Sequence, residues 1–216
     1  MNMREYTAMA SKAMAKAMTI TYKLGTALYI NITNRCTNRC VFCVRTTAAG
    51  VADGLNLWLE REPTVTEVLR DIQQWDTAGL SEFVFCGYGE PLARADATID
   101  ICRELKKSYA VPIRVNTNGQ ANLLYEQDIT PLLAGLVDAV SISMNAKNAQ
   151  EYQAICLSEF GEKAYASMLE FAGKCKQYIP VVVLTVVDIM PPADIRACRE
   201  IARQVGVDFR VRKLVD

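Results

Sequence analysis

The chain of 216 residues is long enough for one well-buried domain, and nothing in its composition requires two. Its 24 basic and 24 acidic residues balance, so the net charge gives no indication of binding to a nucleic acid or to an anionic membrane. No apolar run approaches the roughly 20 residues of a membrane span, and no stretch near residue 1 resembles a signal peptide. We therefore expect a cytoplasmic protein.

The cysteine and histidine contents restrict the chemistry further. Eight cysteines in a chain of this length do not resemble a small disulfide-linked scaffold. Four of them lie in segments with helical periodicity, where reduced, partly buried thiols are the simplest interpretation: Cys102, Cys156, Cys175 and Cys198. Histidine is absent, which excludes Cys₂His₂ zinc sites, Ser-His-Asp triads and a histidine base.

Six runs rich in β-branched and aromatic residues predict strands, and segments of helical periodicity separate them. Residues 1–25 precede the first run and predict an N-terminal helical extension, with a helix over about residues 4–18. The predicted strands are residues 27–32, 82–86, 112–116, 138–144, 181–187 and 207–212.

Helix boundaries are marked at several points between these runs. Thr64 and Glu67 form a capping-box pattern that predicts a helix start, and Gly79 predicts the end of that helix. Pro191-Pro192 predicts the beginning of the last helix, and Gly206 its end. The connection over residues 45–63 is long for a loop between a strand and a helix, which is typical of a functional segment.

Strands that alternate with helices favour right-handed βαβ units and a parallel sheet. Eight such units close a barrel of about 250 residues. Six units predict a partial (β/α)6 TIM-like barrel, with an all-parallel, curved, six-stranded sheet over residues 26–216. Ligands of such folds bind at the carboxyl ends of the strands, so we expect the site at that edge.

Three thiols follow the first predicted strand at this edge: Cys36, Cys40 and Cys43. Thiolates in such a group suit a soft metal centre, either an iron–sulfur cluster or zinc. A structural zinc site would need a fourth protein ligand, for which Cys86 is the candidate at the end of the second strand. If the Cys86 thiol does not reach the metal bound by the other three, one coordination position of that metal stays open, as in catalytic sites.

Two motifs resemble those of the radical S-adenosylmethionine (SAM) superfamily. The spacing Cys-x-x-x-Cys-x-aromatic-Cys occurs at residues 36–43, with Phe42 as the aromatic residue. Residues 87–91 read Gly-Tyr-Gly-Glu-Pro and are similar to the family's Gly-Gly-Glu-Pro turn, with Tyr88 in place of the first glycine. Within the superfamily, residues 40–45 and 57–63 resemble the small TatD-linked radical SAM proteins.

This resemblance implies that the three cysteines hold a [4Fe-4S] cluster, and that the fourth iron binds the amino and carboxylate groups of SAM. It also implies a set of SAM contacts, in which Phe42 lies near the adenine, Glu90 accepts from the ammonium group and short polar side chains meet the ribose. The implied contacts are Phe42, Gly87, Tyr88, Gly89, Glu90, Asn116, Asn118, Ser141, Ser143 and Asn145. No further catalytic residue is assigned.

The implied reaction is reductive cleavage of SAM to a 5′-deoxyadenosyl radical, which abstracts hydrogen from an unidentified small-molecule or nucleoside substrate. The electron would come from a donor such as flavodoxin or ferredoxin. Two alternatives remain open, namely an activating enzyme that places the radical on a partner protein, and a non-catalytic zinc-binding domain. A methyltransferase is disfavoured because no additional cysteine motif or domain for it is evident.

Overall fold

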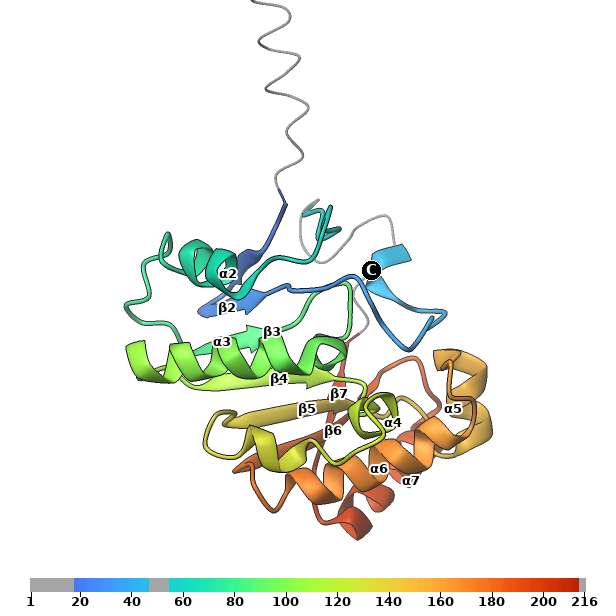
Figure 1. Ribbon diagram of the computed structural model, residues 1–216. Coiled ribbons are helices and arrows are strands. Elements are labelled where there is room, and N and C mark those ends of the chain that lie inside the picture. The colour runs from blue at the N-terminus through green and yellow to red at the C-terminus, as the bar shows by residue number, and fades with distance from the viewer. Residues whose placement is uncertain (1–17, 47–54, 214–216) are drawn as a thin grey trace, which may run out of the picture.

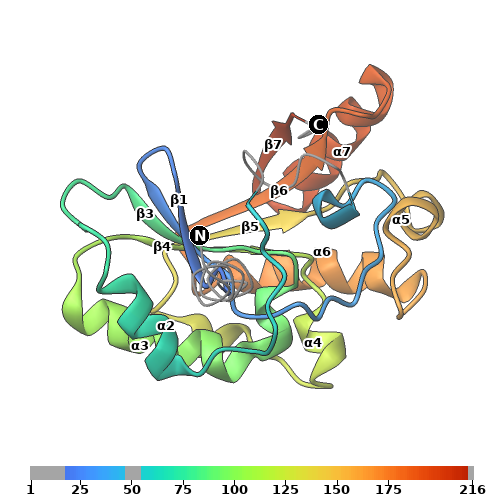
Figure 2. The same cartoon turned by 90° about the horizontal axis from the view of Figure 1, so that it is seen from above.

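The computed structural model describes residues 18–46 and 55–213, and strands that are neighbours in sequence are also neighbours in one curved sheet (Figures 1 and 2). The order of the sheet is β1-β2-β3-β4-β5-β6-β7. The strands are β1 Thr21–Leu24, β2 Ala27–Ile30, β3 Glu82–Phe85, β4 Ile113–Thr117, β5 Ala139–Ser143, β6 Val181–Val187 and β7 Asp208–Arg212. Strands β2 to β7 are parallel to one another, which confirms the predicted α/β fold and its six parallel strands.

The prediction of an all-parallel, six-stranded sheet was wrong at one edge. Strand β1 pairs antiparallel with β2, with Leu24 opposite Ala27, and makes the sheet seven-stranded. Gly25 permits the tight connection because its φ is 58°, a left-handed value that glycine adopts without steric cost. Residues 21–24 therefore belong to the sheet and not to a helical extension, whereas the predicted helix lies outside the described residues except for Met18.

Helices connect the parallel strands and lie outside the curve of the sheet (Figure 2). The α-helices are α2 Val65–Ile72, α3 Ala95–Ser108, α4 Ala121–Leu124, α5 Ala149–Cys156, α6 Lys163–Cys175 and α7 Pro192–Val205. Three single turns of 3₁₀ helix accompany them: η1 Val44–Thr46, η2 Pro91–Arg94 and η3 Thr130–Leu133.

The predicted helix boundaries are confirmed at three of four positions. Thr64 Oγ1 accepts from the Glu67 amide at 3.2 Å, and the Glu67 carboxylate accepts from the Thr64 amide at 2.8 Å. Helix α7 begins at Pro192 and ends before Gly206, whose φ is 78°. Gly79 does not end α2, because the helix tightens to bonds between residues three apart directly after Ile72 and stops there.

The two faces of the sheet differ in chemistry. Alternate side chains such as Leu28, Phe83, Val115, Ile142 and Leu184 are fully buried under the helices. The side chains between them point to the opposite, concave face. That face carries polar side chains from the end of β3 to β7, namely Cys86, Arg114, Asn116, Ser141, Ser143, Thr185, Arg210 and Arg212.

Candidate functional site

The loop with the three cysteines leaves β2 at its carboxyl end, passes beside the end of helix α5 and leads into η1 (Figure 1). The Arg39 amide donates to the carbonyl oxygen of Cys156 at 3.0 Å, and the Val41 amide donates to that of Ile155 at 2.9 Å. Because these carbonyl groups end α5, the helix terminus fixes the loop between Cys36 and Cys43, which we call the cysteine loop.

All three thiols of the cysteine loop are free and half-buried. Burial raises the pKa of Cys36 to about 12. A hydrogen bond with the Cys156 thiol, followed by burial, raises the pKa of Cys40. Without a metal both thiols are therefore protonated at neutral pH, and a bound metal must displace those protons. The contact of Cys156 with the cysteine loop was missed by the sequence analysis, in which Cys156 is only a buried thiol.

The donor chemistry of the loop fits an iron–sulfur cluster with three protein ligands. The side chains that act most strongly on the Cys86 thiol include Asn116, Arg212 and Tyr22 on the concave face, and none of them belongs to the cysteine loop. Over residues 18–46 and 55–213, no group of three or more histidine, cysteine or acidic side chains is already assembled around a metal position. The three thiols nevertheless share one short loop, and no nitrogen ligand of the zinc type accompanies them.

The glycine-rich turn at residues 87–91 packs directly against the chain that leads into the cysteine loop. A Cβ atom on Gly89 would overlap the carbonyl oxygen of Thr33 and lie 2.7 Å from that of Arg35. A Cβ on Gly87 would overlap the side chain of Asn31. The glycines are thus required by contacts within the protein. Their predicted backbone approach to SAM stays a prediction.

Glu90 joins this turn to the end of β4. Its Oε1 accepts from the Leu92 amide at 3.0 Å and from Thr117 Oγ1 at 2.7 Å, and its Oε2 accepts from the Asn118 amide at 2.7 Å. The side chain is almost fully buried, and this burial raises the pKa of the carboxyl group against the effect of the three hydrogen bonds. Glu90 therefore has a structural role in the described chain, and its contact with the ammonium group of SAM stays a prediction.

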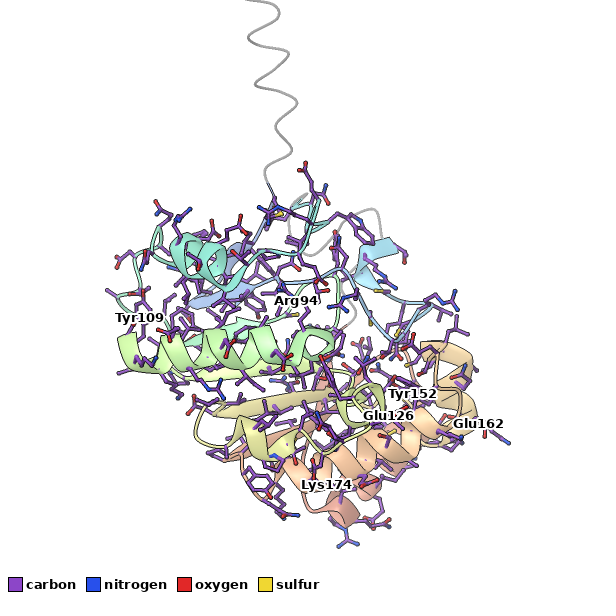
Figure 3. The ribbon with its side chains drawn as sticks, viewed as in Figure 1. Arg94, Tyr109, Glu126, Tyr152, Glu162 and Lys174 are labelled. Carbon is purple, nitrogen blue, oxygen red and sulfur yellow. The ribbon has the colours of Figure 1, made fainter. Side chains whose placement is uncertain are left out.

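A buried polar network holds the cysteine loop to the end of β4. Asn118 Nδ2 donates to Thr37 Oγ1 at 2.8 Å, and Thr37 Oγ1 donates to Gln120 Oε1 at 2.8 Å. Gln120 Nε2 donates to Asn38 Oδ1 and to the hydroxyl of Tyr152, both at 2.8 Å. Tyr152 is labelled in Figure 3 and comes from α5. Of these residues only Asn118 was predicted, because the others meet it only through the fold.

Hydrogen bonds and an ion pair of Arg94 hold the residues that precede the cysteine loop. Arg94, labelled in Figure 3, donates from Nη1 to the carbonyl oxygens of Ile32 and Pro63, at 2.8 and 2.9 Å. Its guanidinium also pairs with Glu62, which accepts from Thr33 Oγ1 at 2.6 Å. The end of the long connection over residues 45–63 is thereby attached to the site, while residues 47–54 lie outside the described chain.

Asn145 carries a buried side-chain oxygen near the cysteine loop. Its φ is 54°, and its Oδ1 is buried without a hydrogen-bond partner among the described residues. Its Nδ2 lies 3.8 Å from the sulfur of Cys156, close to the cysteine loop. An unpaired buried amide oxygen costs stability, and a ligand hydroxyl group would satisfy it.

The remaining predicted contacts have partners that the sequence analysis missed. Ser141 and Ser143 accept from Arg210 and Arg212, at 3.1 and 3.3 Å, and Asn116 accepts from Arg114 at 2.6 Å. All three accepting residues lie on the concave face. Alternation within β4 and β7 places the arginines on one face, but it does not reveal which face or partner they meet.

The two aromatic residues predicted to contact SAM, Tyr88 and Phe42, pack against other apolar side chains. Tyr88 is buried under the end of the long connection, where its ring meets that of Trp58 edge-on at 5.2 Å between centroids. It shares a small cluster with Tyr22 and Leu57. Phe42 is half-buried against the main core. Neither position tests a contact with adenine or substrate.

The structure thus combines a curved, mostly parallel α/β sheet with three free thiols on the loop after its first parallel strand, an arrangement of the partial-barrel class. Consistent with this class, residues 30–205 match the family described as the Radical SAM superfamily. The chain belongs to the radical SAM superfamily, and it is therefore an enzyme of the radical SAM type. No helix in the described part of the chain is long and apolar enough to cross a membrane.

Two relatives of assigned function are GTP 3′,8-cyclases. A probable GTP 3′,8-cyclase of Thermococcus kodakarensis is 25% identical over 191 residues, which are 88% of this chain and 57% of the relative. The GTP 3′,8-cyclase of Lactiplantibacillus plantarum is 29% identical over 128 residues, which are 58% of this chain and 35% of the relative. The chain thus matches only about half, or less, of the length of these relatives.

Solved structures show the same fold at lower identity. SuiB of Streptococcus suis, bound to S-adenosylmethionine, superimposes with a TM-score of 0.66 at 15% identity, over all of this chain and 45% of SuiB. The methyltransferase TsrM of Kitasatospora setae, with cobalamin and a [4Fe-4S] cluster bound, gives a TM-score of 0.55 at 14% identity, over 86% of this chain and 34% of TsrM. The cofactors of this superfamily are therefore SAM and a [4Fe-4S] cluster.

Proposed function

We propose that the chain holds a [4Fe-4S] cluster through Cys36, Cys40 and Cys43, and binds SAM at the one iron that these thiols leave free. When bound, the two cofactors supply reductive cleavage of SAM and a 5′-deoxyadenosyl radical that takes a hydrogen atom from an unreactive C–H bond. The observation that carries the proposal is the donor set. Three thiols lie on one loop, and the candidate fourth ligand, Cys86, faces Tyr22 and Arg212 on the concave face.

The chain's own residues position these groups. The network from Asn118 through Thr37 to Gln120 keeps the cysteine loop in one conformation. Asn145 supplies its unpaired Oδ1 to a ribose hydroxyl group, and the face of Phe42 covers the adenine. The turn at residues 87–90 contacts the methionine part of SAM through its backbone. These contacts follow the family pattern, and the unpaired oxygen of Asn145 is the observation that supports them most directly.

For the substrate we propose a small molecule, and a nucleotide is the first compound to test. The two relatives of assigned function act on GTP by name, which supports this choice over radical transfer to a partner protein. The proposed reaction also needs a one-electron donor of the flavodoxin or ferredoxin kind. Placement among the small TatD-linked radical SAM proteins rests on residues 40–45 and 57–63 and remains part of the proposal.

Anaerobic reconstitution with iron and sulfide tests the proposal. We expect bound iron and labile sulfide, and 5′-deoxyadenosine after addition of SAM and dithionite. Cys36→Ala, Cys40→Ala and Cys43→Ala should each abolish its formation. Cys86→Ala is the matched control, since it also removes a half-buried thiol, and it should retain the cluster.

Two results would contradict the proposal. One is zinc without labile sulfide in the anaerobically purified protein, which would favour the zinc-binding alternative. The other is 5′-deoxyadenosine formation that persists in any of the three variants of the cysteine loop.

A further inference from the structure

Arginine side chains from two strands project from the concave face of the sheet. The register places Arg114 opposite Ala139, Thr185 opposite Arg210 and Val187 opposite Arg212. Because residues two apart in a strand share a face, Arg210 and Arg212 lie on the same side as the serines of β5. Their hydrogen bonds across β6 confirm this, at 3.1 Å to Ser141 and at 3.3 Å to Ser143.

The charges on this face do not balance. Glu82 binds Arg114 with both carboxylate oxygens, at 2.9 and 2.7 Å, and so neutralises that guanidinium. Arg210 and Arg212 form no ion pair with any residue in the described ranges, where serine hydroxyl groups are their side-chain partners. Asp208 lies on the same strand but at its opposite end. Within residues 18–46 and 55–213, the guanidinium groups of Arg210 and Arg212 therefore have no carboxylate partner on the concave face.

Arg212 is the more informative of the pair because it is largely buried. Its Nε atom is buried and has no hydrogen-bond partner among the described residues. Burial lowers the pKa of its guanidinium, and Arg210 lowers it further, whereas the Cys86 and Cys40 thiols act in the opposite direction. A buried guanidinium nitrogen without an acceptor costs stability, and an oxyanion of a ligand would supply an acceptor for this Nε atom.

Geometry places the carboxyl end of β5 beside the cysteine loop: Arg212 donates to Ser143, and Asn145, two residues further on, lies 3.8 Å through its Nδ2 from the sulfur of Cys156. The carbonyl oxygen of Cys156 in turn accepts from the Arg39 amide of the loop at 3.0 Å.

We propose that Arg210 and Arg212, together with Ser141 and Ser143, bind an anionic group of the substrate, a phosphate or a carboxylate. Guanidinium groups donate to both kinds of oxyanion in a planar, two-pronged geometry. Each serine oxygen accepts from an arginine, so its own proton stays available to donate to the same anion. The site lies on the concave face near the cysteine loop, where a substrate must lie if the proposed function is right. This inference rests on that function.

Binding of anionic probes to the anaerobically reconstituted protein with SAM tests the inference. Titration calorimetry with pyrophosphate, succinate, GTP and guanosine separates the sources of the anion, since pyrophosphate represents a phosphate and succinate a carboxylate. At least one of the first three should bind. Arg210→Gln and Arg212→Gln should each weaken that binding about tenfold or more, the scale of one hydrogen bond to a charged group. If phosphate is the group, GTP should bind more tightly than guanosine.

Arg196→Gln is the matched control, because it removes the same charge from an exposed position on α7. It should leave every affinity unchanged. Arg210 is exposed, so Arg210→Gln should fold even if Arg212→Gln does not. The inference is overturned if none of the three anions binds the unmodified protein, or if Arg210→Gln and Arg196→Gln have the same effect.

The same samples keep the inference and the proposed function apart. Iron and sulfide content reports on the cluster alone, and the basal rate of 5′-deoxyadenosine formation should be equal in the unmodified protein and in Arg196→Gln. Loss of the cluster in the unmodified protein, with anion affinities that still depend on Arg210, would refute the proposed function only. A normal cluster with affinities that do not depend on either arginine would refute the anion site only.

Discussion

Replacement of Glu90 by alanine tests whether the main role of this residue is to stabilise the fold through its hydrogen bonds. The carboxylate accepts three hydrogen bonds, and two of them come from the backbone amides of Leu92 and Asn118. Each buried amide left without an acceptor costs roughly 1–3 kcal/mol, so the pair gives about 2–6 kcal/mol. Relief of the buried charge offsets part of this cost. We therefore expect Glu90→Ala to lower the free energy of unfolding by about 2–4 kcal/mol.

Urea unfolding followed by circular dichroism measures this difference, with SAM affinity determined on the same protein under native conditions. Glu90→Gln keeps one acceptor oxygen and should lose about half as much stability as Glu90→Ala. A loss below about 1 kcal/mol for Glu90→Ala would refute the structural reasoning. If SAM affinity then falls while the free energy of unfolding does not, Glu90 contacts the ligand and does not stabilise the fold.

Two further substitutions test local features of the fold. Gly89→Ala should reduce both stability and cluster content, because the added Cβ would overlap the carbonyl oxygen of Thr33. Thermal unfolding measures the stability and iron analysis measures the cluster content. A stable variant with a normal cluster would contradict the expected clash. Thr64→Ala removes the cap of α2 and should cost about 1 kcal/mol in urea unfolding without any effect on cluster content, whereas Thr64→Ser should be nearly neutral.

Local sequence patterns determined most of the secondary structure and the position of the site. The six parallel strands were predicted because each is a short run rich in β-forming residues, and the capping pair Thr64 and Glu67 marked the start of α2. Strand β1 was missed because residues 21–24 are too few and too mixed to give a signal before they pair with β2. Propensity acts over a few neighbours, so it detects elements that are long or strongly patterned.

The identity of the candidate metal ligands was also contained in the sequence, because Cys36, Cys40 and Cys43 are close neighbours in the chain. Their surroundings were decided only by the tertiary structure. Tyr152 meets Asn38 across 114 positions, and Arg210 meets Ser141 across 69. The second contact depends on the strand order and register that place β5 and β7 on either side of β6, and neither is encoded by the residues on one side of the contact alone.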